Sequence, residues 1–315
     1  MDSKRKGLAF GLAGLAVFGC LATGFSSKPA ALGPLPAPVQ AMAATATATA
    51  IPTVTASRQP TEAPQVVPSV ARPSVDPPAA PRPTVVPDVA YHVPVLTYHR
   101  IVPRKESGKS LASMVVEPAL FRAQLSKLHT AGWHTVTLEQ LARAMASGAP
   151  VPPKTFAITI DDGWDDGYRY AFPIMRELGF DATYFVISSR VGAPSFLSAP
   201  QLLEMQAAGF EIGNHTMDHA LLSSLSYREA LADISGASDA LARTLGRRPV
   251  SLAYPKGGVA PFVLDAARAC PGIEIAVTTV AGRTETWRTR FETPRLGVDS
   301  SVTPAALLAE LTAGR

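Results

Sequence analysis

From residue 91 to the end of the chain, short apolar runs alternate with segments whose apolar residues recur at helical spacing. The runs at 93–98 and 156–161 are rich in apolar and β-branched residues, which is typical of strands buried in a parallel sheet. Strands are predicted at 93–98, 133–137, 156–161, 181–187, 210–213, 250–254, 273–279 and 291–298. Helices are predicted near 117–131, 137–147, 166–178, 199–208, 226–245, 259–269 and 303–313.

This alternation predicts an α/β fold built on a parallel sheet, either open or closed into a barrel. About 225 residues suit one (β/α) barrel somewhat shorter than usual. In such folds the working side chains lie just after the strands, at their C-terminal ends. The candidate chemical residues occupy such positions: His99, Asp161, Asp162, His215, His219 and Tyr254.

The first 28 residues have the pattern of an export signal. Lys4-Arg5-Lys6 precedes an uncharged apolar run at 7–27, which is the order of a basic region and an apolar core. Lipidation at Cys20, retention as an uncut membrane anchor and cleavage near 41–43 all stay open. Residues 1–28 are therefore predicted as a signal peptide or a lipoprotein or membrane anchor. We expect the protein to be exported to the cell envelope, membrane-attached or secreted.

Residues 29–90 differ from everything that follows them. They hold 14 of the chain's 29 prolines and no aromatic residue. Such a segment cannot bury enough apolar surface to offset the entropy of ordering, and proline biases it toward extended conformations. We predict a disordered linker at 29–90 and one folded domain at 91–315.

Charge and cysteine content exclude two classes of explanation. Residues 1–90 carry seven Lys/Arg and four Asp/Glu, whereas 91–315 carry 22 and 21. The folded part is therefore nearly neutral, and nothing in it indicates a nucleic-acid surface. With Cys20 in the signal, Cys270 stands alone in the domain, which excludes a disulfide within it.

Two adjacent carboxylates, Asp161 and Asp162, end the strand predicted at 156–161 and precede Gly163. Neighbouring carboxylates repel each other unless a cation or a proton compensates them. An Asp-Gly turn leading into the next helix is an equally good explanation of this pair taken alone.

Two histidines, His215 and His219, are spaced four residues apart. Imidazoles at this spacing can meet one metal ion, although six histidines make such a pair unremarkable by itself. Together with one carboxylate they would form a three-ligand site with open positions for water, which is the layout of a hydrolytic metal centre.

The order of these motifs resembles the NodB-type polysaccharide deacetylases, carbohydrate esterase family 4. Thr159-Ile160-Asp161-Asp162-Gly163 matches the first motif, and the stretch from His215 to His219 matches the second. Leu252-Ala253-Tyr254-Pro255-Lys256-Gly257 is similar to the third motif in its Y-P-x-G form. The wider resemblance runs from about 93 to 300, and it implies a distorted (β/α) barrel of about seven strands.

The resemblance also implies the roles of the site residues. Asp162, His215 and His219 become the ligands of a divalent metal ion, with zinc favoured and cobalt, nickel or iron also suited to such a site. Asp161 becomes the general base that takes a proton from water. The family adds a backbone N–H at the position of Tyr254 to the oxyanion site, and the Tyr254 side chain is expected to line the groove.

The chain departs from the main family pattern at two places. The third motif lacks the arginine that orients the base, and no histidine follows His219, so the late leucine–histidine motif is absent. The circularly permuted poly-β-1,6-N-acetylglucosamine deacetylases bring an early histidine into the site, and 93–99 is similar to their first strand. His99 is therefore the candidate acid for the leaving amine, with a structural core histidine as the alternative.

Two further residues are candidates for substrate binding. Trp164 could stack on a sugar ring or serve only for packing. Arg295, on a late predicted strand, could contact substrate or replace the missing base-orienting arginine, and a surface or structural arginine is the alternative.

The expected partner is an N-acetylated polysaccharide, with the membrane as a second partner through the N-terminal segment and no nucleic acid. The first strand favours poly-N-acetylglucosamine, while peptidoglycan and chitin-like oligomers stay open. A catalytically weak or inactive carbohydrate-binding envelope protein is the alternative function, because the third-motif arginine is missing.

Overall fold

The computed structural model describes residues 88–110, 112–282 and 286–313. The predicted signal or anchor at 1–28 lies outside the described residues, as does nearly all of the predicted linker at 29–90. Both stay predictions. Within the described ranges, no helix combines the length and the apolar character needed to cross a membrane.

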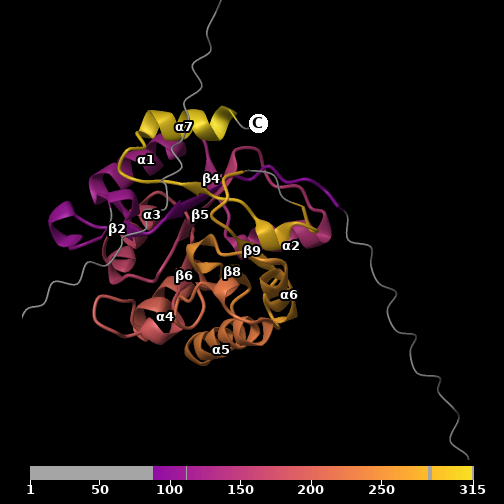
Figure 1. Ribbon diagram of the computed structural model, residues 1–315. Helices are drawn as coiled ribbons and strands as arrows, with labels where there is room; N and C mark the ends of the chain where they lie inside the picture. The colour runs from indigo at the N-terminus through magenta and orange to yellow at the C-terminus, as the bar shows by residue number, and fades with distance from the viewer. Residues whose placement is uncertain (1–87, 111, 283–285, 314–315) are drawn as a thin grey trace, which may run out of the picture. The chain divides into compact units, whose positions relative to one another are not determined.

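A parallel sheet forms the centre of the domain (Figure 1). Its main strands lie in the order β10-β1-β5-β6-β7-β8-β9, and β4 pairs with β5 in addition. Each predicted strand overlaps an observed one, but the prediction of a strand over 291–298 is wrong at its start, because Arg290–Glu292 form a 3₁₀ turn and only Leu296–Gly297 are strand. The bounds of the observed strands are β1 (Val95–Tyr98), β4 (His134–Thr135), β5 (Thr155–Ile160), β6 (Thr183–Val186), β7 (Glu211–Asn214), β8 (Ser251–Ala253), β9 (Ile275–Val277) and β10 (Leu296–Gly297).

The segment 293–297 links the two edges of this sheet. At its start, Thr293 accepts a hydrogen bond from the Thr278 N–H (2.9 Å) and donates its own N–H to Ala276 O (3.0 Å), beside β9. At its end, β10 pairs with β1, Leu296 opposite Leu96. The ring is uneven, because β7 and β8 share a single registered pair. The predicted distorted (β/α) barrel of about seven strands is confirmed.

Seven α-helices occupy the predicted positions within the described ranges. Thr137 and Ser226 begin two of them with capping boxes, and Gly148 and Gly246 end the same two in the left-handed conformation that glycine tolerates. The bounds are α1 (Pro118–Thr130), α2 (Leu138–Ser147), α3 (Phe172–Glu177, preceded by a π-helical turn at Gly167–Ala171), α4 (Ala199–Ala207), α5 (Tyr227–Leu245), α6 (Pro261–Ala269) and α7 (Pro304–Ala313).

Shorter elements were not predicted. The two-residue strands β2 (Arg100–Ile101) and β3 (Val115–Val116) pair only with each other, and no apolar run of strand length marks them in the sequence. Single 3₁₀ turns lie at Arg104–Glu106, Ala112–Met114, Ser188–Arg190, Leu222–Ser224, Pro255–Gly257 and Arg290–Glu292.

Alternation along the strands divides the core into an inner and an outer face. Val95, Ala157 and Phe185 pack in one buried cluster with residues of α2, whereas Leu96 and Ile158 pack in another with the outer helices. The same alternation places Asp161 on the inner face with Ala157. The start of α2 contacts β6 and β7 at their N-terminal ends, so this helix covers the inner face at that end of the barrel. It does not cover the C-terminal strand ends, where the inner face carries polar side chains.

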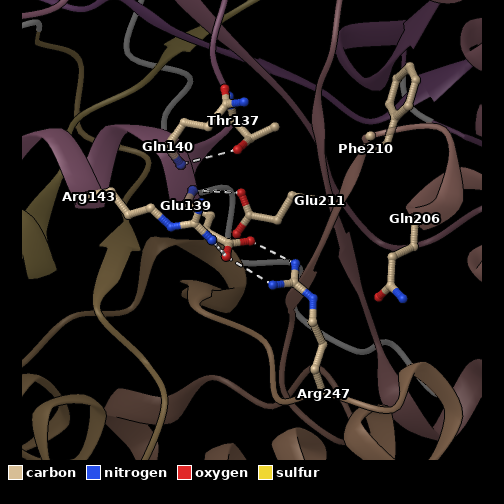
Figure 2. A pocket seen from close by; sticks show the side chains of 9 residues that line it. Thr137, Glu139, Gln140, Arg143, Gln206, Phe210, Glu211 and Arg247 are labelled. Carbon is tan, nitrogen blue, oxygen red and sulfur yellow. Dashed lines mark hydrogen bonds and ion pairs between the residues drawn. The ribbon is translucent and has the colours of Figure 1, made fainter.

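A network of charges joins α2 to the N-terminal end of β7, with the two carboxylates buried and Arg247 exposed (Figure 2). Arg247 forms two hydrogen bonds with the Glu139 carboxylate (2.9 and 2.7 Å), which hold the pKa of Glu139 below its ordinary value despite burial. Glu211 Oε2 accepts from the Glu139 N–H (2.8 Å) and from the Thr183 hydroxyl (2.9 Å). Burial raises the pKa of Glu211, and these hydrogen bonds compensate only in part.

The free energy of unfolding of Glu211→Gln, relative to that of the wild type, is therefore expected to increase as pH rises. A carboxyl whose pKa is raised by folding stabilises the fold while it is protonated, and this contribution is lost as pH rises through the folded pKa. Glutamine mimics the protonated carboxyl at every pH, so the variant does not lose this stabilisation. The pH-dependent contribution of Glu139 is the same in both proteins and cancels in the comparison. Urea unfolding of both proteins at pH 5 and pH 8 measures the change. If the variant became less stable relative to the wild type between pH 5 and pH 8, the pKa of Glu211 would not be raised in the folded state.

Candidate active site

The parallel sheet brings the sequence motifs to one edge. β1 and β5 are paired up to Tyr98 and Ile160, and the Asp161 N–H donates to Tyr98 O (3.0 Å). His99 and Asp161 therefore leave neighbouring strands side by side. The His215 N–H donates to Val186 O (3.0 Å) at the end of β6, which places the second motif at the same edge.

Asp161 is buried and faces an arginine. Arg295 donates through Nη1 to Asp161 Oδ1 and through Nη2 to Oδ2, both at 2.8 Å. Burial raises the pKa of Asp161, but the charges of Arg295 and His215 and the hydrogen bonds from Arg295 outweigh it, so the pKa lies below its ordinary value. The carboxylate is thus held ionised in a fixed orientation, as a general base requires.

Arg295 reaches Asp161 from the segment that closes the barrel. Its side chain is 1% exposed, and it also donates to Thr278 O (2.8 Å) and to the Thr159 hydroxyl (3.0 Å). The interpretation of Arg295 as a solvated surface residue is therefore wrong. Its burial and its protein partners argue against the expected contact with a polymer, and they favour the alternative of a base-orienting arginine.

Asp162, His215 and His219 converge beside this pair. Asp162 Oδ1 lies 3.4 Å from His215 Nε2 and 3.5 Å from His219 Nε2, and one ligand atom from each side chain lies within 4.8 Å of the others. Two atoms bound about 2.1 Å from a tetrahedral ion are about 3.4 Å apart, so the set fits a small divalent cation.

The charge states of Asp162 and His219 suit a cation, whereas His215 must give up a proton to bind one. Burial lowers the pKa of His215, but the hydrogen bond to Asp162 and the charges of Asp161 and Asp162 outweigh it and raise the pKa. Burial raises the pKa of Asp162, but the hydrogen bond and charge of His215 outweigh it with help from His99 and His219, so the carboxyl is ionised. Burial and the neighbouring His215 lower the pKa of His219. A carboxylate and a neutral imidazole are the forms that bind metal.

The backbone fixes how the two histidines point. His215 Nδ1 lies 2.9 Å from Ala253 O, and because a carbonyl only accepts, Nδ1 carries the proton and Nε2 faces Asp162. The Thr216 N–H donates to Asn214 Oδ1 (2.6 Å), and the His219 N–H donates to Thr216 Oγ1 (3.1 Å). Asn214 is anchored in turn to α5 through Ile234 O (2.9 Å).

Left-handed backbone conformations gather at this edge. Asp162 (φ 74°), Thr216 (φ 63°), His219 (φ 59°) and Lys256 (φ 56°) all have positive φ although none is glycine. Such conformations cost free energy and cluster at functional sites, where the surrounding structure holds them. Here they turn Asp162 away from the face of Asp161, so the adjacent carboxylates reach different partners.

His99 lies at the predicted position. It is half-buried, it follows β1 directly, and its charge helps to lower the pKa of both Asp161 and Asp162, which places it near both carboxylates. The imidazole therefore lies within electrostatic reach of both carboxylates, and no hydrogen bond among the described residues holds its ring.

The expectations for Tyr254 are wrong. Its backbone N–H donates to Val277 O (3.2 Å) in the β8–β9 ladder and is not free for an oxyanion. Its side chain is fully buried and its hydroxyl donates to Phe291 O (3.0 Å), so it does not line a groove. The tyrosine packs in the core between β8 and α6 because the alternation of β8 directs it outward.

Trp164 packs against protein groups on its ring faces. Its indole stacks on Phe196 with ring centroids 4.4 Å apart, and the Arg100 guanidinium lies 4.5 Å from the same ring. This arrangement favours the packing alternative over sugar stacking. The indole N–H donates to Asp162 Oδ2 (3.2 Å), a contact that no sequence pattern indicated.

A parallel barrel with an Asp–His–His set and a second buried carboxylate at its C-terminal strand ends has the construction of a hydrolytic centre. Residues 148–272 match the model of the polysaccharide deacetylase family. This segment is a polysaccharide deacetylase domain, the domain of a class of hydrolases.

Individual relatives agree. YxkH of Bacillus subtilis, which carries the name of a polysaccharide deacetylase, is 30% identical over 190 residues, 60% of this chain and 65% of its own length. The poly-β-1,6-N-acetyl-D-glucosamine N-deacetylase of Staphylococcus aureus is 26% identical over 51% of this chain and 63% of its own. The match thus spans less than two thirds of either curated relative.

A solved structure shows the same fold. The deacetylase PplD of Streptococcus pyogenes, solved in complex with acetate, superposes with a TM-score of 0.64 at 26% identity. The similarity covers 71% of this chain and 99% of that one.

Proposed function

We propose that this protein is a metal-dependent hydrolase that removes N-acetyl groups from an N-acetylated polysaccharide. The proposal rests on the different surroundings of Asp161 and Asp162. One carboxylate faces Arg295 and the other faces two imidazoles, although the residues are adjacent in sequence. A base and a metal ligand are the two roles that such different surroundings suit.

Asp162, His215 and His219 would hold the cation. Zinc suits this donor set best, and cobalt, nickel or iron fit it as well. A divalent cation bound there acts as a Lewis acid and promotes the ionisation of water at neutral pH. The convergence of one ligand atom from each of these side chains to within 4.8 Å of the others supports this assignment.

Asp161 and His99 divide the proton transfers. Asp161 accepts a proton from the water that attacks the acetamide carbonyl, while Arg295 keeps the carboxylate oriented and ionised. When the C–N bond breaks, His99 donates a proton to the nitrogen, so that acetate and an amine leave. Arg295 thereby takes the part of the arginine missing from the third motif, which weakens the case for an inactive carbohydrate-binding protein.

His99 as the acid is supported by its place at the end of β1, ahead of Asp161 in the chain. This order would put the protein in the circularly permuted subgroup. His99→Ala is expected to keep metal and substrate binding but to lose about 10²-fold or more in turnover of the amide. The loss on an activated acetate ester should be much smaller, because that leaving group needs no proton.

Parallel kinetics on the two substrates, with metal content measured for each preparation, test this. Equal losses on the amide and the ester would leave His99 as a positioning or core residue.

The named activity of the Staphylococcus aureus relative favours poly-N-acetylglucosamine as substrate, with peptidoglycan and chitin-like oligomers as the other polymers to compare. An envelope polymer also suits the export signal and linker predicted at 1–90, which would hold the domain at the membrane or release it. Acetate release by metal-loaded protein across these polymers tests the function and ranks the substrates. A metal-loaded protein that releases no acetate from any of them would refute the proposal.

A further inference from the structure

The two oxygens of Asp162 have different neighbours. Oδ1 faces His215 Nε2 and His219 Nε2 at 3.4 and 3.5 Å, whereas Oδ2 accepts the indole N–H of Trp164 at 3.2 Å. Among the residues that the structure describes, this N–H is the only hydrogen-bond donor to Oδ2. The indole therefore determines which oxygen of the carboxylate is left for the imidazole side.

Such a contact matters because an aspartate carboxyl rotates easily. The terminal torsion of aspartate is broad, so neither oxygen has an intrinsic preference for the site. A donor fixed on one oxygen selects one orientation and presents the other oxygen to a cation. The left-handed backbone at Asp162 (φ 74°) and at Gly163 (φ 75°) brings Trp164 back toward the carboxylate two residues before it.

The indole is itself held from both sides. Trp164 and Phe196 form an antiparallel bridge, and their rings are stacked at an interplanar angle of 21°. The Arg100 guanidinium packs on the indole as a cation–π partner.

Arg100 is fixed in turn by a buried acid. Its Nε donates to Asp166 Oδ2 at 2.7 Å, and the Asp166 side chain is fully buried. Nη1 of Arg100 also donates to the Ser110 hydroxyl at 2.9 Å, and Asp166 Oδ1 accepts the Ile101 N–H at 3.2 Å. A chain of contacts thus runs from Asp166 through Arg100 and Trp164 to Asp162.

We propose that Trp164 is a positioning residue for the metal ligand Asp162, and that the Arg100–Asp166 pair holds the indole in position. The inference rests on the proposed metal centre. It assigns to Trp164 a part in cation binding through its N–H, in place of contact with a sugar. Residues that orient metal ligands in this way contribute about 10–100-fold to metal affinity.

The sharpest test removes the N–H and nothing else. Replacement of Trp164 by 3-benzothienylalanine, introduced at that position alone, puts sulfur in place of the N–H and keeps the size and stacking of the ring. Affinity for Zn²⁺, measured by competition with a chelator, should fall about 10–100-fold, and the visible spectrum of the Co²⁺-loaded protein should change. Trp164→Phe should lose at least as much Zn²⁺ affinity. Trp287→Phe serves as the control, because no contact between Trp287 and Asp162, His215 or His219 occurs among the described residues.

The outcomes separate this inference from the function on which it rests. Wild-type protein that binds no stoichiometric metal would refute the metal centre itself. Wild-type protein that binds metal, with unchanged affinity and spectrum in the benzothienyl variant, would refute the role of Trp164 alone. The metal-free benzothienyl variant should still unfold cooperatively and lose no more stability than one buried hydrogen bond supplies, since the packing of the ring is retained.

The part played by Arg100 is tested by coupling. Arg100→Met combined with Asp166→Asn removes the cation from the indole without leaving a buried unpaired charge. We expect a loss of several-fold in Zn²⁺ affinity and little further loss when Trp164 is already replaced by 3-benzothienylalanine, because both changes act through Oδ2 of Asp162. Fully additive losses would show that Arg100 does not act through Trp164.

Discussion

His215→Ala is expected to lose the bound cation and the deacetylase activity together. The substitution removes one of three ligands and leaves a carboxylate and a single imidazole, fewer than the three protein ligands that a catalytic metal site uses. It also frees Ala253 O, whose lost hydrogen bond costs about 1–3 kcal/mol of stability. The barrel should nevertheless fold, because its core is apolar and does not depend on the ion.

Metal content by elemental analysis, acetate release and circular dichroism on the same preparation check this. His129→Ala is the matched control, since His129 is an exposed histidine on α1, away from the strand ends. A folded His215→Ala protein with full stoichiometric metal would remove His215 from the ligand set.

Asp161→Asn should retain the metal and lose about 10²–10⁴-fold in turnover, the range expected for a general base. An asparagine side chain cannot accept the water proton, while Asp162 and the two histidines are untouched. Metal stoichiometry and acetate release, measured together, distinguish this result from loss of the site. Near-normal turnover would mean that another group serves as the base.

Stability must be controlled in this experiment, because Asp161→Asn leaves the buried charge of Arg295 without its partner. Removing one member of a buried ion pair costs about 3–5 kcal/mol. The double variant Asp161→Asn with Arg295→Met removes both charges and is expected to regain stability but not activity. Chemical unfolding of the single and double variants separates the two effects.

Much of the site could be predicted because its residues follow strands. The apolar run of β5 ends at Ile160, and β7 ends at Asn214, directly before His215. In a parallel sheet such ends share one edge, so Asp161, Asp162 and His215 had to be neighbours whatever the details of the fold. The alternation of apolar and amphipathic segments sufficed for this argument.

The contacts that complete the site depend on how the barrel closes. Arg295 reaches Asp161 across 134 positions of sequence because the segment at 293–297 lies between β9 and β1. No local pattern distinguishes such an arginine from a solvated one. The same holds for Trp164, whose partners Arg100, in β2, and Phe196, after β6, come from separate parts of the chain.

For Tyr254 the sequence predicted a role that the structure does not allow. Its motif matched, but the alternation of β8 directs its side chain into the core and its N–H into the ladder with β9. A motif indicates the place of a residue in the chain, whereas pairing determines which of its groups are free.

Metal-dependent deacetylation is tested by measuring both products of one reaction. Metal-loaded full-length protein is incubated with an oligomer of β-1,6-linked N-acetylglucosamine, and acetate and new primary amine are determined in the same sample. We predict equimolar acetate and amine, both abolished when the metal is removed by a chelator and restored by Zn²⁺. Binding of the oligomer by fully metal-loaded protein without release of either product would contradict the account.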